Sequence, residues 1–73
     1  MKNEHDMILN GILEFDRPFN LTDLYYKFSK MGIINRIKII NILDYLCDSG
    51  RVEYYEIDSD IWDFEVVMLW KNL

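Results

Sequence analysis

Hydrophobic positions recur with a helical period in three segments of the first fifty residues. We expect a helix over about residues 4–15, a short helix that is capped by Thr22 and stops at Gly32, and a longer helix over residues 35–49, with Asn35 as its cap. Glycine follows the second and third segments, where helices commonly end in a left-handed residue. The third segment has the clearest apolar stripe, formed by Ile39, Ile42, Leu43 and Leu46.

The last third of the chain changes to a two-residue period. Residues 51–57 are rich in β-formers, and residues 61–70 alternate after a turn at 58–60. The alternation predicts one buried face, made of Trp62, Phe64, Val66, Met68 and Trp70. Because two strands alone are marginally stable, we expect residues 19–21 to pair as a third strand at the edge of the hairpin.

The order of these elements predicts a single α+β domain over residues 1–73. Helix, short strand, helix, turn, longer helix and hairpin is the order of a winged helix-turn-helix domain, with three helices, a small antiparallel sheet and a two-stranded wing. Residues 43–53 resemble the end of the third helix of such domains, where it runs into the first wing strand. Residues 19–24 resemble the entry from the short strand into the second helix. The fold serves many unrelated roles, so it does not by itself assign one.

A narrower resemblance is carried by a few residues spread through the helical part: Arg17-Pro18-Phe19-Asn20, Asp23-Leu24, Gly32 and the leucine-glycine end of the third helix. They are similar to the N-terminal winged-helix domain of the TBPIP family. The members of that family are eukaryotic meiotic homologous-pairing proteins that bind duplex DNA. The resemblance implies DNA binding through the third helix and the wing. The wing of that family is basic and contains glycine, whereas residues 56–60 here are acidic and contain none.

Charge is distributed unevenly along the 73 residues, whose net charge is −5. Residues 1–51 hold seven acids and seven bases, so their charges cancel. Residues 52–73 hold six acids and one base, so the entire net charge lies there. Affinity for duplex nucleic acid comes largely from cations set against phosphates. We therefore expect the last third of the chain to repel a phosphate backbone.

Three polar residues on the expected third helix are candidates for contacts with DNA. Arg36 and Lys38 suit phosphate or guanine, and Asn41 suits adenine, because this helix enters the major groove in winged-helix proteins. Asp44 and Asp48 on the same helix would also approach the phosphates. The alternative interpretations are that these three residues belong to an ordinary solvated helix face or contact a protein. The first functional interpretation is a non-enzymatic DNA-binding protein, either a transcriptional regulator or a recombination accessory, which needs a dimer or a basic partner.

Four apolar residues point instead to a protein partner. Ile37 and Ile40 face outward on the third helix, and Val67 and Leu69 lie opposite the tryptophans on the last strand. Together they would form a contiguous patch typical of an interface. The alternative is that the first helix or the N-terminal tail covers Val67 and Leu69. The second interpretation is an acidic protein-interaction module within a nucleic-acid-handling complex, which does not itself bind DNA.

Neither an enzyme nor a metal site is expected. His5 and Cys47 are the only residues of their kinds, and a metal site needs three or four convergent ligands. The acidic hairpin lacks the glycine and closing glutamate of a calcium loop. We expect Cys47 to be a partly buried packing residue and the aromatic side chains of residues 54–70 to belong mostly to the core. No cofactor and no small-molecule substrate are expected.

The composition also predicts the compartment. Hydrophobic residues make up 51% of the chain, which excludes a disordered tail. No stretch approaches the roughly 20 apolar residues of a spanning helix, and the N-terminus lacks the pattern of a signal peptide. One cysteine fits a reducing environment. We expect an intracellular protein, cytoplasmic or nuclear, that binds either duplex DNA or a protein and that can form a homodimer.

Overall fold

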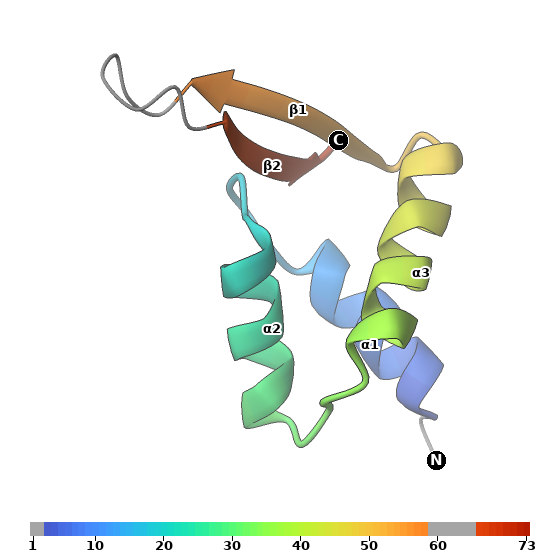
Figure 1. The fold of residues 1–73 in the computed structure, drawn as a ribbon. Helices are drawn as coiled ribbons and strands as arrows, with labels where there is room; N and C mark the ends of the chain where they lie inside the picture. The colour runs from blue at the N-terminus through green and yellow to red at the C-terminus, as the bar shows by residue number, and fades with distance from the viewer. Residues whose placement is uncertain (1–2, 59–65) are drawn as a thin grey trace.

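The computed structural model describes residues 3–58 and 66–73 of the chain. Its elements follow in the order α1 (Glu4–Leu13), α2 (Leu21–Lys30), α3 (Arg36–Asp48), β1 (Val52–Asp58) and β2 (Val66–Asn72). The strands pair antiparallel in a two-stranded sheet, which confirms the α+β class and is compatible with a winged-helix layout (Figure 1). The expected turn at 58–60 lies mostly outside the described residues, as do Trp62 and Phe64.

An asparagine caps each helix. Asn3 caps α1, and the side chain of Asn35 caps α3, as predicted. Asn20 caps α2 through a reciprocal pair of bonds: its Oδ1 accepts the N–H of Asp23 at 2.8 Å, and Oδ2 of Asp23 accepts the N–H of Asn20 at 3.2 Å. Thr22 is therefore not the cap, and α2 begins one residue before it. The prediction was wrong because a capping box satisfies two backbone donors, which a lone threonine hydroxyl does not.

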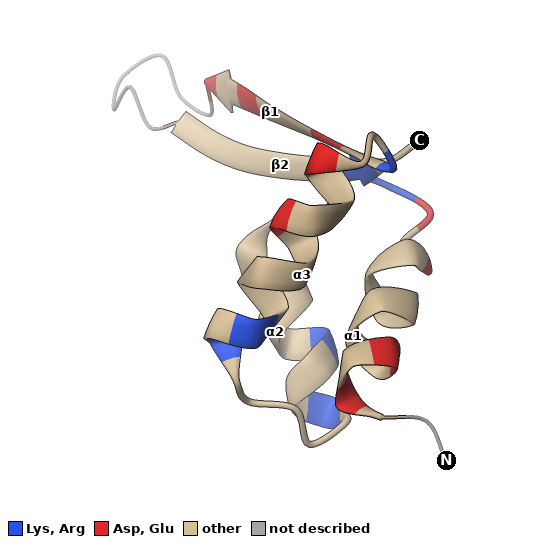
Figure 2. Cartoon of the chain, turned by 90° about the vertical axis from the view of Figure 1, so that its right-hand side faces the viewer, with Lys and Arg blue, Asp and Glu red and all other residues tan. Residues whose placement is uncertain are grey.

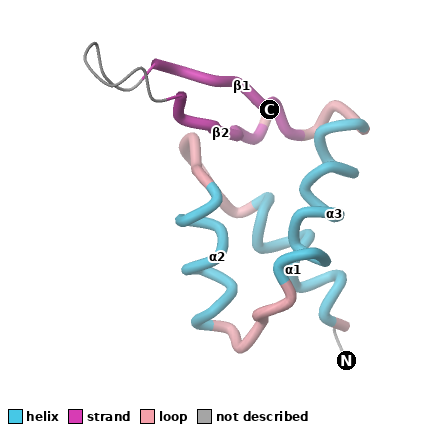
Figure 3. Tube along the Cα trace, in the orientation of Figure 1, coloured by secondary structure: helices cyan, strands magenta, loops and turns pink. Residues whose placement is uncertain are grey.

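Two of the three helices end just before the glycines that were predicted to terminate them. Gly32 and Gly50 both have φ of +78°, so the left-handed termination after α2 and α3 is confirmed. The first helix ends at Leu13, earlier than predicted. Phe15 has left the helix and stacks on Phe19, with ring centroids 4.4 Å apart. The α1–α2 and α2–α3 connections are loops in Figure 3.

One core unites all five elements. The α1 and α2 helices meet at Gly11, where the Phe28 ring occupies the space that a Cβ would fill, with Cε1 only 2.5 Å from that position. Glycine at this position therefore permits the close approach of the two helices. The buried side chains are Ile8, Ile12, Phe19, Leu24, Phe28, Ile33, Ile39, Ile42, Leu43, Leu46, Val52 and Trp70.

The end of β2 is tied to the helical part of the chain by backbone and side-chain hydrogen bonds. Phe19 and Trp70 exchange two backbone hydrogen bonds, at 2.8 and 2.9 Å, in an isolated bridge. The expected third strand at residues 19–21 is thus reduced to one residue pair. The Asn72 side chain donates from Nδ2 to the carbonyl oxygens of Ile12 and Phe15, at 2.9 and 2.8 Å. These bonds hold the chain's last strand against the end of its first helix.

The predicted buried face of the last strand is only partly correct. Trp70 is buried, but Val66 and Met68 are exposed. The reason is that only the C-terminal part of β2 pairs with Phe19, while its other end extends beyond the helices (Figure 2). The expectation that the aromatic residues are mostly core fails similarly at Tyr54, which is exposed, and at Tyr55, which is half-buried.

Candidate functional site

The two predicted DNA-contacting cations leave α3 on different flanks. Residues two apart on an α-helix differ by about 200° around its axis. The Arg36 guanidinium lies over the ring of Tyr25 on α2, 4.7 Å from its centroid. The Lys38 ammonium lies 3.7 Å from a carboxylate oxygen of Glu4 on α1. The two charges therefore point toward neighbouring helices and do not converge on one groove-facing surface.

The outward face of α3 is acidic. Opposite the buried stripe, the helix presents Ile37, Asn41, Asp44 and Asp48, all exposed. Figure 2 shows the two aspartates as red segments in the second half of α3. Asn41 is thus available to solvent, as predicted, but its neighbours along the helix toward the sheet are carboxylates. The structure does not bring Arg36, Lys38 and Asn41 together.

The four predicted interface residues lie in two separate places. Ile37 is 76% exposed and Ile40 is half-buried, and both belong to the half of α3 farther from the sheet (Figure 1). Val67 and Leu69 belong to β2 and are both half-buried. The expectation of one contiguous patch is therefore wrong, because the length of α3 separates the pairs.

Val67 and Leu69 form part of an apolar face of the sheet. In the register of the hairpin, Tyr55 pairs with Leu69 and Ile57 pairs with Val67. Side chains alternate between the faces of a strand, so these four project away from the face that carries buried Trp70. We call Tyr55, Ile57, Val67 and Leu69 the outer apolar face. Tyr55 and Ile57 were missed from the sequence, although the hairpin register would have indicated them.

Acidic residues of β1 lie beside the outer apolar face, Glu53 on the same face of the sheet and Glu56 and Asp58 on the opposite face. Glu53, Glu56 and Asp58 are exposed along the strand, and Figure 2 shows them in red. Lys71 lies on β2, with its ammonium 3.5 Å from a carboxylate oxygen of Glu53. The described part of the sheet therefore carries a net negative charge beside its apolar residues.

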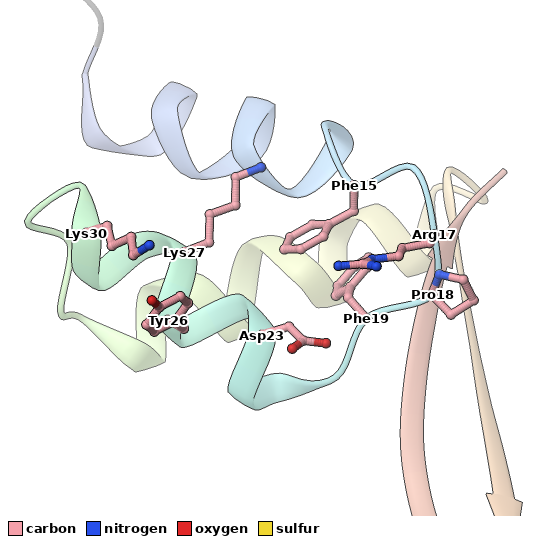
Figure 4. Close-up of a pocket in the computed structure, with 8 residues that line it drawn as sticks. All are labelled: Phe15, Arg17, Pro18, Phe19, Asp23, Tyr26, Lys27 and Lys30. Carbon is pink, nitrogen blue, oxygen red and sulfur yellow. The ribbon is translucent and has the colours of Figure 1, made fainter.

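A cavity of about 320 Å³ lies between the α1–α2 connection and α2. Figure 4 shows the side chains that line it: Phe15, Arg17, Pro18, Phe19, Asp23, Tyr26, Lys27 and Lys30. Three are cations, three are aromatic, and one is a carboxylate. Sequence reasoning missed this site, because its residues are spread over sixteen positions, and those quoted for the family resemblance implied DNA binding through other elements.

Part of the charge in the cavity is already engaged. The Lys27 ammonium donates to the Gly11 carbonyl oxygen at 2.7 Å and pairs with Glu14 at 3.2 Å. The Lys30 ammonium lies over the Tyr26 ring, 4.4 Å from its centroid. Within residues 3–58 and 66–73, no carboxylate forms an ion pair with Lys30 or Arg17. Two cations of the cavity are therefore open to an anion.

Cys47 packs against the core, as predicted. Burial raises the pKa of its thiol, and the carboxylates of Asp44 and Asp48 raise it further, while a hydrogen bond with the Trp70 side chain opposes them. A raised pKa leaves little nucleophilic thiolate at neutral pH. Among the described residues, no group of three histidine, cysteine or acidic side chains is placed to hold a metal ion.

In the part of the chain that the structure describes, no helix is long and apolar enough to cross a membrane. Comparison with known protein families, curated proteins and solved structures gives no match. Functional proposals for this chain therefore rest on the outward face of α3, the outer apolar face and the cavity beside α2.

Proposed function

We propose that this chain is a non-enzymatic protein-interaction module that binds an extended basic segment of another protein along its sheet. The observation that carries the proposal is the outer apolar face, where two cross-strand pairs of large apolar side chains point away from the core. Ile57, one of the four residues of this face, is 46% exposed. Clustered apolar side chains of this kind are typical of interaction surfaces.

The backbone of β1 supports strand addition as the mode of binding. Trp70 directs its N–H and carbonyl oxygen toward Phe19, and hence away from β1. In an antiparallel pair the two residues directly opposite each other share this orientation, so the backbone groups of Tyr54 point away from β2. The backbone groups of Glu56, two residues further along β1, also point away from β2. An outer edge of this kind accepts an extended segment as a further strand.

Charge selects the partner. Glu53, Glu56 and Asp58 lie along the strand that would receive the segment. A second copy of this chain would bring the same carboxylates and a net charge of −5 to the contact, so self-pairing is opposed. A segment that alternates apolar and basic residues complements both the outer apolar face and the acids of β1. Its apolar side chains extend the outer apolar face, and its cations meet the acids of β1.

A synthetic ten-residue peptide of alternating valine and lysine tests the proposal. Its addition to the ¹⁵N-labelled chain is expected to shift the amide resonances of β1 and of Leu69. Ile57→Ser is expected to weaken binding about tenfold, which corresponds to about 1.4 kcal/mol for partial loss of one buried isoleucine. The matched control is Ile37→Ser, which removes the same side chain from the far half of α3 and is expected to leave binding unchanged.

Three results would refute this function. The first is an absence of shifts at millimolar peptide. The second is equal binding of a peptide in which glutamate replaces lysine, because charge would then not select the partner. The third is self-association of the unliganded chain in sedimentation, lost in Ile57→Ser, because the occupant would then be a second copy.

Binding of duplex DNA through α3 is the second candidate function. The exposed position of Asn41 on the outward face of the helix favours it. A gel shift at low salt separates the two functions, with the double substitution Arg36→Ala/Lys38→Ala as the control. A shift that the double substitution abolishes supports DNA binding. A shift that is insensitive to the substitution, or no shift at tens of micromolar protein, counts against it.

A further inference from the structure

The cavity beside α2 combines features that the sheet does not use. We propose that it binds one unpaired nucleotide, with the base against the Tyr26 ring and the phosphate at Arg17. The site is distinct from both surfaces considered above, because none of its lining residues belongs to α3 or the sheet.

The size and lining of the cavity suit a small planar ligand. Its volume of about 320 Å³ lies at the lower end of the range for small-molecule sites. Tyr26 is 63% exposed, so its ring is accessible to a ligand. Phe15 is half-buried and closes the lining, because its ring stacks on Phe19 and has the Lys27 ammonium 4.5 Å from its centroid. Stacking of a base on an aromatic ring contributes about 1–3 kcal/mol and tolerates any base.

The cations at the cavity suit a phosphate. Arg17 enters from the α1–α2 connection, and Lys30, in the last turn of α2, lies at the other end of the lining beside Tyr26 (Figure 4). The planar guanidinium of arginine matches two phosphate oxygens at once, and lysine adds a point charge. Lys27 is held by Gly11 and Glu14, so it supplies positive potential without being the contact group. In a chain of net charge −5, this is a local concentration of positive charge.

Asp23 distinguishes a nucleotide from an acidic peptide as the occupant. Its Oδ2 accepts the Asn20 N–H, which leaves Oδ1 to accept a hydrogen bond from a sugar hydroxyl or a base amine. Nucleotides carry such donors beside their phosphate, and carboxylates bind ribose hydroxyls in other nucleotide sites. An acidic peptide carries such donors only on its backbone, so its carboxylate side chain makes no use of Asp23.

The ligand must be unpaired, because a base within a duplex is stacked and hydrogen-bonded and cannot enter a cavity. A free mononucleotide and a nucleotide within a single strand present the same chemistry to these residues. Adenosine monophosphate and a single-stranded hexa-adenylate distinguish these sources. Equal affinity per site indicates a free nucleotide, and tighter binding of the strand indicates a strand contact. Either result supports the site.

Amide-resonance titration of the ¹⁵N-labelled chain tests the proposal. Adenosine monophosphate is expected to shift the amide resonances of residues 15–17, 19 and 23–30. Arg17→Gln is expected to weaken binding about tenfold, whereas Arg51→Gln, the same change outside the cavity, is expected to have little effect. Tyr26→Leu is expected to weaken binding of the nucleotide but not of inorganic phosphate. The peptide response of β1 is expected to survive all three substitutions, so this test and that of the sheet are independent.

Several outcomes would overturn the assignment. One is the absence of any shift with either nucleotide probe at millimolar concentration. Another is inorganic phosphate that binds as tightly as adenosine monophosphate and remains unaffected by Arg17→Gln, since the Tyr26 ring and the Arg17 guanidinium would then play no part. A third is an aspartate-phenylalanine peptide that binds the cavity more tightly than the nucleotide, which would identify an acidic protein segment as the occupant.

Discussion

Replacement of Gly11 by alanine is expected to destabilise the fold, although it improves helix propensity. In an unconstrained helix, Gly→Ala adds about 1 kcal/mol to stability. Here the new Cβ would lie 2.5 Å from Cε1 and 2.8 Å from Cζ of Phe28. That ring is completely buried and has no solvent side to move into. Overpacking of a core costs about 1–3 kcal/mol. Because the ring cannot yield, we expect a cost near the top of that range and a net loss of about 1–2 kcal/mol.

Urea denaturation followed by circular dichroism measures this loss directly, because small domains usually unfold in two states. Thermal melting is expected to shift downward by about 4–8 °C for each kcal/mol at this size. The matched control is Asn10→Ala, one residue earlier in the same helix and exposed. It improves propensity without entering the core, so it is expected to raise stability slightly.

The double substitution Gly11→Ala/Phe28→Leu isolates the contact. In the Phe28→Leu background the ring carbons are gone, so the alanine is expected to be neutral or stabilising. A coupling free energy above about 1 kcal/mol would be typical of residues in direct contact. An increase in stability from Gly11→Ala alone, comparable to that from Asn10→Ala, would refute the close packing of α1 on α2.

Three further substitutions or measurements test other parts of the structure. Asn20→Ala is expected to lower the free energy of unfolding by about 1 kcal/mol through loss of the cap, whereas Thr22→Ala changes it by less than about 0.5 kcal/mol; the reverse order in urea denaturation would restore Thr22 as the cap. Asn72→Ala is expected to cost about 1 kcal/mol, at the low end for two lost hydrogen bonds, because Oδ1 of Asn72 has no described partner; an unchanged urea midpoint would contradict the tie between β2 and α1. Since burial raises the pKa of Cys47, the folded chain holds less thiolate than the urea-unfolded chain at mildly alkaline pH. Iodoacetamide is therefore expected to alkylate the folded chain more slowly and to react faster as the pH approaches the raised pKa; equal rates would contradict this environment.

Local signals predicted the helices well. The apolar stripe of α3, the asparagine cap before it and the left-handed Gly32 and Gly50 depend on residues within a few positions of one another. The prediction of Thr22 as the cap of α2 was wrong because Asn20 and Asp23 act as a reciprocal pair, and neither residue indicates this pairing when it is considered alone. The overestimated buried face of β2 has a different cause. A two-residue period indicates which residues share a face but not how far the helices extend beneath it.

The candidate sites required the tertiary structure. The opposite directions of Arg36 and Lys38 follow from helical geometry and were available from the sequence. Their partners Tyr25 and Glu4 lie on other helices, so the engagement of both charges was not predictable locally. The cavity beside α2 depends on the way Phe15 leaves α1 and stacks on Phe19. No periodic pattern encodes that turn, because it is fixed by packing between elements.

The tie between Asn72 and the end of α1 has a consequence for the order of events during synthesis. The donor and the two carbonyl oxygens it binds are 60 and 57 residues apart. Trp70, which completes the core beside Phe19, is translated after all three helices. The three helices therefore leave the ribosome before the strand that seals them, and closure of such distant contacts is slow. A ribosome-tethered chain arrested before residue 70 is expected to keep an open, protease-sensitive core that closes once the last strand emerges.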